Sequence, residues 1–373
     1  MVWRKGAQTV FMRVTVVATI LAGLLTFTGC IFFGGGGNGG HQMAFITAPF
    51  NGGIAVYTIS DITGKFTQLL GSPYPTGISP TQAVLAPSGK FVYLANGGEN
   101  DISLFQVASS GALTEVMPRT PTGVNPSALA IDPGGAFLYA ANASSNTIDS
   151  YKVDTSKGAL TAASSVATGF TPLKLAISPS GKFIYVSNNS SNSVSGFAVD
   201  SSGGFTPVPG SPYAVGLGPN GIIVDPAGKF LYVASLTGGN FSGFTIDSGS
   251  GALTPMSGSP YAVAVSTTVI PLSAAMVDRS GKYLYVTAVN ANKVYAYTIN
   301  ATTGVPVLIS SSPFATGGGP AFISNDAEGQ FLFVGNQSTS NVSVFRITQS
   351  SGVLTSIQTE SVLSAPTSMV VIK

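Results

Sequence analysis

Charged side chains are scarce in this chain, so the residues that could carry out chemistry can be taken one by one. Only 8% of the 373 residues are charged, and His41 is the one histidine. Lys174 is distinctive because it follows Pro172 by two residues in an apolar segment whose counterparts elsewhere carry neutral residues. A lysine at this position could hold a carboxylate or phosphate as a point charge, or it could simply be solvated.

Two further polar residues are candidates for ligand binding. Gln82 follows Pro80 by two residues, so it occupies the same position as Lys174 in a related segment, and we expect the side chains at this position to face the centre of the fold. Arg119 lies near the end of a different segment, close to Glu115. We expect Arg119 either to reach the same site or to be an ordinary surface residue.

A set of asparagines recurs at the ends of similar apolar segments, at Asn96, Asn142, Asn188 and Asn336. A ring of such amides could hydrogen-bond sugar hydroxyls or carbonyls. Alternatively, asparagine is favoured there because it tolerates left-handed backbone and ties its side chain to the turn.

Metal and cofactor sites are not expected. One histidine and one cysteine, Cys30, cannot supply a set of transition-metal ligands. Residues 216–221 match the pattern GxGxxG, but Pro219 interrupts it and a strand follows where a dinucleotide site requires a helix. We therefore predict no metal and no cofactor.

The segments that position these residues belong to an internal repeat. Each copy has an apolar strand, a turn that usually opens with Pro, the residues Gly-Lys-Phe, and a second apolar strand. A degenerate first copy begins at Met43. The spacing of about 46 to 53 residues is typical of propeller blades. The clearest copies of the turn and second strand are residues 87–96, 133–142, 179–188, 226–235, 279–286 and 327–336.

Each full copy predicts four strands, A to D. In the third copy they are expected at residues 127–131, 137–141, 147–153 and 160–166. The first copy lacks strand A, whereas residues 366–372 resemble a strand A that no strand B follows. The sequence therefore predicts an all-β, seven-bladed β-propeller of four-stranded antiparallel blades, whose ring is closed when the C-terminal strand completes the first blade.

The sequence of the N-terminus predicts an export signal. Arg4, Lys5 and Arg13 precede an apolar run over residues 14–27, which ends at Gly29 and Cys30. This pattern is typical of a secretory leader, whose start could be Met1 or Met12. A lone cysteine at this place resembles the bacterial lipobox, which implies cleavage before Cys30 and its lipidation. The alternative is an ordinary signal peptide with an incidental cysteine.

We therefore predict three regions: a lipoprotein signal peptide at 1–29, a lipidated cysteine with a Gly-rich tether at 30–42, and the propeller at 43–373. The expected location is the cell envelope, on the exported side of a membrane to which Cys30 is anchored. Removing the three leader residues from the 16 basic ones leaves 13 against 14 acidic residues. This balance does not favour nucleic-acid binding, and we expect a monomer.

The repeat resembles the lactonase-type seven-bladed propellers, a group that includes 6-phosphogluconolactonase and a muconate cycloisomerase, and also the Tyr-Val-Thr-Asn surface-protein repeats. The resemblance rests on Ser-Pro-Ser-Gly-Lys-Phe at 178–183, Tyr-Val-Ser-Asn at 185–188 and Gly-Ala-Leu-Thr at 111–114, 158–161 and 251–254. These residues build turns and cores, so they specify the fold more than the activity.

The resemblance implies lactone chemistry that uses His, Glu and Arg near the central channel. In this chain His41 lies in the tether, and Arg279 and Glu328 fall in A–B turns. Two hypotheses follow. The first is an envelope propeller that binds a glycan, small molecule or protein at its channel, which the scarcity of titratable residues favours. The alternative is a lactone hydrolase acting on a sugar lactone.

Overall fold

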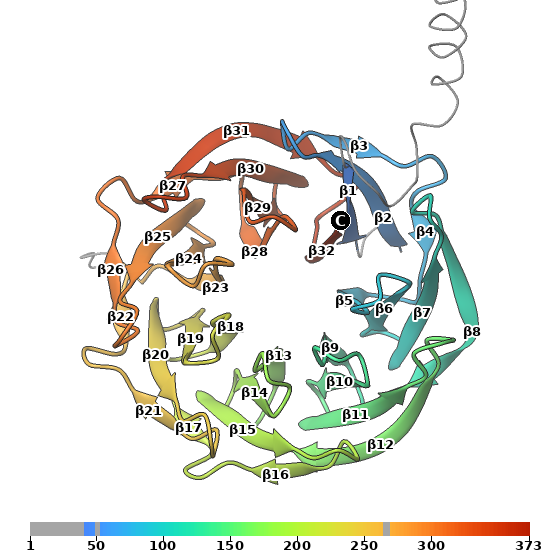
Figure 1. The fold of residues 1–373 in the computed structure, drawn as a ribbon, viewed down its shortest axis with the longest axis horizontal. Helices are drawn as coiled ribbons and strands as arrows, with labels where there is room; N and C mark the ends of the chain where they lie inside the picture. Colours follow the sequence, from blue (N-terminus) through green and yellow to red (C-terminus); the bar gives the residue numbers. More distant parts are fainter. Residues whose placement is uncertain (1–40, 49–52, 264–268) are drawn as a thin grey trace, which may run out of the picture.

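The structure is a computed structural model that describes residues 41–48, 53–263 and 269–373. These residues form strands and turns that build seven antiparallel sheets, arranged as blades around a common centre (Figure 1). Among them there is no helix long and apolar enough to cross a membrane. The predicted all-β, seven-bladed propeller is confirmed. The leader, Cys30 and the Gly-rich segment lie outside the described residues.

Each blade runs from an inner strand A to an outer strand D. The first blade contains β32 (Ser368–Ile372), β1 (His41–Ala48), β2 (Gly53–Ser60) and β3 (Phe66–Gln68), with β4 (Tyr74–Pro75). The second contains β5 (Pro80–Leu85), β6 (Phe91–Asn96), β7 (Asp101–Val107) and β8 (Leu113–Pro121). The third contains β9 (Pro126–Ile131), β10 (Phe137–Asn142), β11 (Thr147–Val153) and β12 (Leu160–Ala167).

The remaining four blades follow the same order. The fourth has β13 (Pro172–Ile177), β14 (Phe183–Asn188), β15 (Ser193–Val199), β16 (Phe205–Pro207) and β17 (Tyr213–Ala214). The fifth has β18 (Pro219–Val224), β19 (Phe230–Ser235), β20 (Asn240–Ile246), β21 (Leu253–Pro255) and β22 (Tyr261–Ala262). The sixth has β23 (Leu272–Val277), β24 (Tyr283–Ala288), β25 (Lys293–Ile299), β26 (Pro306–Leu308) and β27 (Phe314–Ala315). The seventh has β28 (Pro320–Asn325), β29 (Phe331–Asn336), β30 (Asn341–Ile347) and β31 (Leu354–Ser361).

The inner strands β32, β5, β9, β13, β18, β23 and β28 surround the centre of the ring (Figure 1). Because strands alternate in direction, the A–B and C–D turns share one side, called here the A–B face. The D–A and B–C loops share the other side, called the D–A rim. The strands of the third blade differ from their predicted bounds by at most one residue at each end.

The outer strand is interrupted in four blades, where a Ser-Pro pair separates two short strands. Proline has no N–H to donate to the strand C ladder. The serine hydroxyl instead accepts a hydrogen bond from a strand C amide, as Ser211 does from Gly196 at 3.0 Å. The equivalent serines are Ser72, Ser259 and Ser312. The four strands of each blade are therefore retained, with strand D in two pieces in these blades.

The hydrophobic core lies between neighbouring blades. Tyr185 on β14 is fully buried, and its hydroxyl donates to the carbonyl oxygen of Gly251 in the next blade at 2.8 Å. Gly251 has a φ of +73° and lies against the ring of Phe183, where a Cβ atom would come within 2.4 Å of Cδ1. Thus the repeated Phe-x-Tyr motif of one blade contacts the Gly-Ala-Leu-Thr motif of the next blade. The same hydroxyl-to-glycine bond is made by Tyr93, Tyr232 and Tyr285.

The ring closes as predicted. Strand β32 pairs with β1, with Phe45 opposite Val370, so the first blade takes its inner strand from the other end of the chain. The hydroxyls of Thr47 and Ser368 lie 2.8 Å apart across this junction. Strand β1 begins at His41, two residues before the expected boundary, and Gln42 is buried with its Nε2 donating to Asp326 at 3.2 Å.

Candidate functional site in the central channel

The position two residues after each strand A proline was expected to face the channel. The structure corrects this expectation for five of the seven blades, in which the residue is buried. Short side chains at this position lie against the next blade, as Gly221 does against Ala274, whereas Phe322 packs over Gly335 of its own blade. Only Gln82 and Lys174 are partly exposed. The buried residues are Ala128, Gly221, Ser273, Phe322 and Ser368.

Gln82 and Lys174 meet although their blades are not neighbours. The Nζ atom of Lys174, on β13, donates to Oε1 of Gln82, on β5, at 3.0 Å. The Nε2 atom of Gln82 donates in turn to the carbonyl oxygen of Leu129, on β9, at 3.1 Å. These two hydrogen bonds link the inner strands of the second, third and fourth blades, and we call them the Gln82 bridge.

Lys174 has no carboxylate partner among the residues that the structure describes. Within residues 41–48, 53–263 and 269–373, the ion pairs within 4.0 Å involve only Arg119 and Lys373 as cations. Burial lowers the pKa of Lys174 to about 8, because the charged form loses solvation in the channel. The side chain therefore carries its charge near neutral pH, with an amide oxygen as its partner.

A cavity of about 600 Å³ lies in the channel between the Gln82 bridge and the A–B face. Gln82 lines one end, and residues of the inner strands line the walls. Arg279 lines the opposite end, where its Nε donates to the carbonyl oxygen of Asp326 at 3.2 Å. The lining is mixed: Ser324 and Asn325 contribute polar groups, whereas Leu129 and Met369 line it although their side chains are buried between blades.

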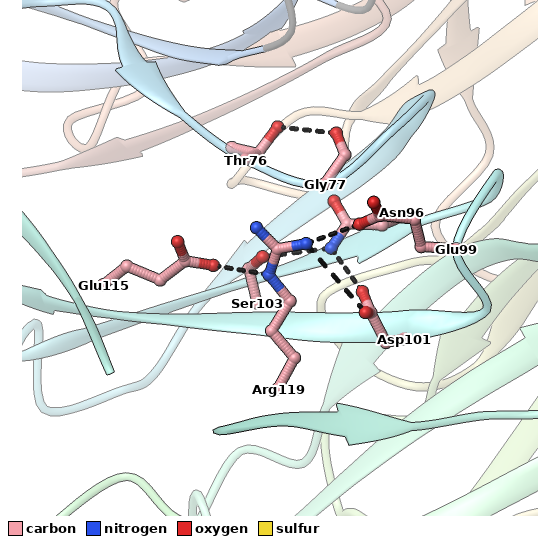
Figure 2. A network of polar contacts seen from close by, with 8 residues as sticks. All are labelled: Thr76, Gly77, Asn96, Glu99, Asp101, Ser103, Glu115 and Arg119. Atoms are coloured by element: carbon pink, nitrogen blue, oxygen red, sulfur yellow. Dashed lines mark hydrogen bonds and ion pairs between the residues drawn. The ribbon is translucent and has the colours of Figure 1, made fainter. Parts of the chain in front are cut away.

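Arg119 belongs to a separate network on the D–A rim side of the second blade (Figure 2). Its Nε donates to Glu115 at 2.7 Å, and its Nη1 contacts Glu99 at 2.5 Å, with Asp101 at 4.0 Å. The hydrogen bond to Glu115, together with the charges of Glu115, Asp101 and Glu99, raises the pKa of Arg119 despite its partial burial. One guanidinium is therefore matched by three carboxylates, and Arg119 is not available to an anionic ligand.

The four candidate asparagines are fully buried. The amide nitrogen of Asn188 donates to Ser193 at 3.1 Å and to Ser195 at 2.9 Å, both on the adjacent strand C. Its side chain also packs against Gly169 of the D–A loop, where a Cβ atom would come within 2.8 Å. Asn96, Asn142 and Asn336 repeat this arrangement. Side chains with no exposed surface cannot contact a ligand in this conformation, so we do not include them in the site.

No group of three or more His, Cys, Asp and Glu side chains suited to a metal ion occurs in the described part of the chain. The polar side chains described in the channel are Lys174, Gln82, Arg279, Ser324 and Asn325.

The sequence profile described as lactonase, seven-bladed β-propeller matches residues 38–174, 168–270 and 264–371. The chain belongs to this family. No curated protein matches the sequence of this lactonase-family chain. Solved structures share its fold at low identity, and three of them illustrate the range.

A candidate 6-phosphogluconolactonase from Bacteroides fragilis is 21% identical with a TM-score of 0.78, over 89% of this chain and 98% of that one. A protein from Lactobacillus plantarum is 18% identical with a TM-score of 0.79, over 90% and 100%. The periplasmic gluconolactonase PpgL from Pseudomonas aeruginosa is 18% identical with a TM-score of 0.75, over 90% and 99%. At these identities the likeness shows the fold alone.

Sequence reasoning identified Lys174 and Gln82 separately but did not bring them together. The repeat aligns Lys174 and Gln82 to the same position of their blades. A local sequence pattern, however, does not predict a contact between the second and the fourth blade. Arg279 was assigned to an A–B turn, which is correct, but its place at the end of the cavity was not predicted. The approach of Glu99 to Arg119 also comes from the fold, since the two residues lie on different segments of the blade.

Proposed function

We propose that this lactonase-family propeller binds a small organic anion in its central channel. The observation that carries the proposal is Lys174, a half-buried cation hydrogen-bonded to Gln82, with no carboxylate within 4.0 Å among the described residues. A buried charge that lacks a counter-ion is costly. An anionic ligand beside Lys174 would remove that cost, which makes the channel selective for negative charge.

The test is binding of small carboxylates to the exported protein, measured by calorimetry at pH 7. Lys174→Met keeps most of the side-chain volume and removes the charge, so affinity should fall at least about tenfold. Lys182→Met is the matched control, because Lys182 is exposed in the A–B turn of the same blade. Equal affinity in the wild type and in Lys174→Met would contradict the proposal.

Lactone hydrolysis is the second candidate function. It is favoured by membership of the lactonase family and by the pKa of about 8 at Lys174, because a partly neutral amine could accept a proton from an attacking water. A sugar-lactone hydrolysis assay tests it. Activity that Lys174→Met abolishes would support catalysis at this residue. No rate above background with an intact fold would exclude it.

We further propose an exported, lipid-anchored location. The support is the apolar run that ends at Cys30 and the likeness in fold to a periplasmic gluconolactonase. His41 lies at the A–B face, where β1 begins opposite Ser60, so an anchor at Cys30 would turn that face toward the membrane. Cys30→Ala should shift the protein from the membrane fraction to the soluble fraction. Unchanged membrane association would contradict the anchor.

A further inference from the structure

We propose that the D–A rim is a docking surface for a second copy of this chain, so that two propellers pair face to face around a two-fold axis. The pairing rests on exposed apolar side chains and on the distribution of charge along this rim. It is independent of the proposed anion binding, and its failure would leave that proposal standing.

The apolar side chains recur at one position of the D–A loops, two residues before the proline that precedes or opens strand A. Phe170 at this position is 67% exposed, and the least exposed member of the set, Val124, is still 53% exposed. Single exposed apolar residues are ordinary on a protein surface, but a set that shares one rim is typical of an interaction site. We call this set the apolar row, and it consists of Ile78, Val124, Phe170, Leu217 and Val269.

The loops that carry the apolar row are held in place by hydrogen bonds. The amide of Phe170 donates to Oγ of Ser191 at 2.7 Å, and its carbonyl oxygen accepts from the amide of Ser190 at 3.2 Å. The next amide, that of Thr171, donates to Oδ1 of Asn146 in the preceding blade at 2.8 Å. This loop is thus fixed to both of the blades that it joins. A surface that is already ordered loses little conformational entropy when a partner binds.

The charges on the rim differ between the second and the sixth blade. In the second blade Glu99, Asp101 and Glu115 surround Arg119, which leaves an excess of negative charge (Figure 2). Lys293 opens β25 in the sixth blade, at the position that Asp101 holds at the start of β7. It is exposed, and no carboxylate of the described residues lies within 4.0 Å of it. A partner that brings these two regions together is therefore favoured.

A second copy of the chain meets this requirement. A two-fold axis that lies in the plane of the rim and passes through the fourth blade brings the second blade of one copy onto the sixth blade of the other (Figure 1). The acidic and basic regions then meet twice. In the same arrangement Ile78 faces Val269, Val124 faces Leu217, and Phe170 lies near the axis opposite Phe170 of the second copy. The charges and the apolar row are thus satisfied by one arrangement.

The rim is also the face that the proposed anchor leaves open. Strand β1 begins at His41 on the A–B face, so an anchor at Cys30 directs the D–A rim away from its membrane. In a face-to-face pair the two A–B faces lie on opposite outer sides. If the anchor is present, paired copies therefore come from two facing membranes. This consequence rests on the proposed location, whereas the pairing itself does not.

The experiment uses the exported protein with Cys30→Ala, which removes the one cysteine of the chain. Sedimentation equilibrium at micromolar concentrations should show monomer and dimer in exchange. Phe170→Ser should raise the dissociation constant of the dimer at least about tenfold, because aromatic side chains at the centre of an interface contribute most to affinity. Leu70→Ser is the matched control, because Leu70 is 96% exposed but lies between β3 and β4 on the outside of the first blade.

Single cysteines then test the arrangement. On mild oxidation Phe170→Cys should form a disulfide-linked dimer, whereas Leu70→Cys should remain monomeric. Ile78→Cys should cross-link with Val269→Cys in a mixture but not with itself.

A dimer that Phe170→Ser weakens and that Phe170→Cys cross-links supports the inference. Three results overturn it: a monomer at every concentration, as the sequence led us to expect; a dimer that Phe170→Ser leaves unchanged; or Ile78→Cys that cross-links only with itself. A monomer that binds phosphatidylcholine vesicles through Phe170 also overturns it, because the rim would then be a membrane contact.

Discussion

The Nζ atom of Lys174 lies 3.0 Å from the Oε1 atom of Gln82, although a complete blade separates the two strands that carry them. The contact spans part of the channel and gives the one charged residue of the inner-strand row a neutral partner. Most other blades fill the same position with a buried residue that packs between blades. This departure from the repeat is therefore the position at which we propose that the ring binds an anion.

The first prediction concerns stability and pH. The folded-state pKa of Lys174 is about 8, below the unfolded value of about 10.4. Below pH 8 both states are protonated and the folded state carries the full cost of burying the charge, and above pH 10.4 that cost is gone. Lys174→Met should therefore be more stable than the wild type at pH 7 by about 2 kcal/mol, and this gain should vanish near pH 10.5. Chemical denaturation at both pH values measures it. A gain that is equal at the two values would disprove the assignment.

The second prediction tests the hydroxyl contacts between blades. Tyr185→Phe leaves the buried carbonyl of Gly251 unpaired and should cost about 1–3 kcal/mol of unfolding free energy. Tyr297→Phe is the matched control, because the Tyr297 hydroxyl is buried and has no hydrogen-bond partner in the described part of the chain. Its removal should be neutral or stabilising. Equal losses in the two variants would show that the hydrogen bond to Gly251 is not what matters.

The third prediction concerns the turn glycines. Gly251→Ala places a Cβ atom 2.4 Å from the Phe183 ring at a φ of +73°, so it combines backbone strain with overpacking. The expected loss is about 2–4 kcal/mol. Gly249→Ala in the same turn meets nothing closer than 3.5 Å and has no positive φ, so its stability should stay close to that of the wild type. Thermal unfolding of the two variants makes the comparison, and a well-tolerated Gly251→Ala would argue against the packing described.

The fourth prediction tests ring closure. A chain that ends at Ala365 lacks β32, so the ladder opposite Phe45 is lost and β1 becomes an exposed edge. Its melting temperature should fall sharply. Removal of Lys373 alone disrupts only an exposed ion pair with Glu328 and should leave the melting temperature unchanged. An unaffected melting temperature in the longer truncation would contradict closure by β32.

The repeat made much of the fold predictable. Strands follow from alternating apolar residues, and turns follow from Pro, Gly and Asn at fixed places, because both depend on local chemistry. Ring closure was also predictable, since residues 366–372 have the pattern of a strand without a partner. The Asn188 side chain, by contrast, could be assigned to the turn or to a ligand until its burial was known.

The site was less accessible to sequence reasoning. Lys174 was identified because it is the charged residue at a position that is neutral in the other copies of the repeat. Its partner Gln82 could not be predicted, because the spacing of residues in the sequence does not show where the end of a long side chain lies. The cavity arises from side chains of several inner strands together, and no single copy of the repeat encodes it. Arg119 was a reasonable candidate by type and position, yet the approach of Glu99 and Asp101 neutralises it.

The most direct test of anion binding in the channel is a crystal structure of the protein with 4-bromobenzoate, located by anomalous scattering from bromine. The carboxylate should lie within hydrogen-bonding distance of Lys174 Nζ, beside Gln82. A carboxylate bound away from Lys174 would contradict the account.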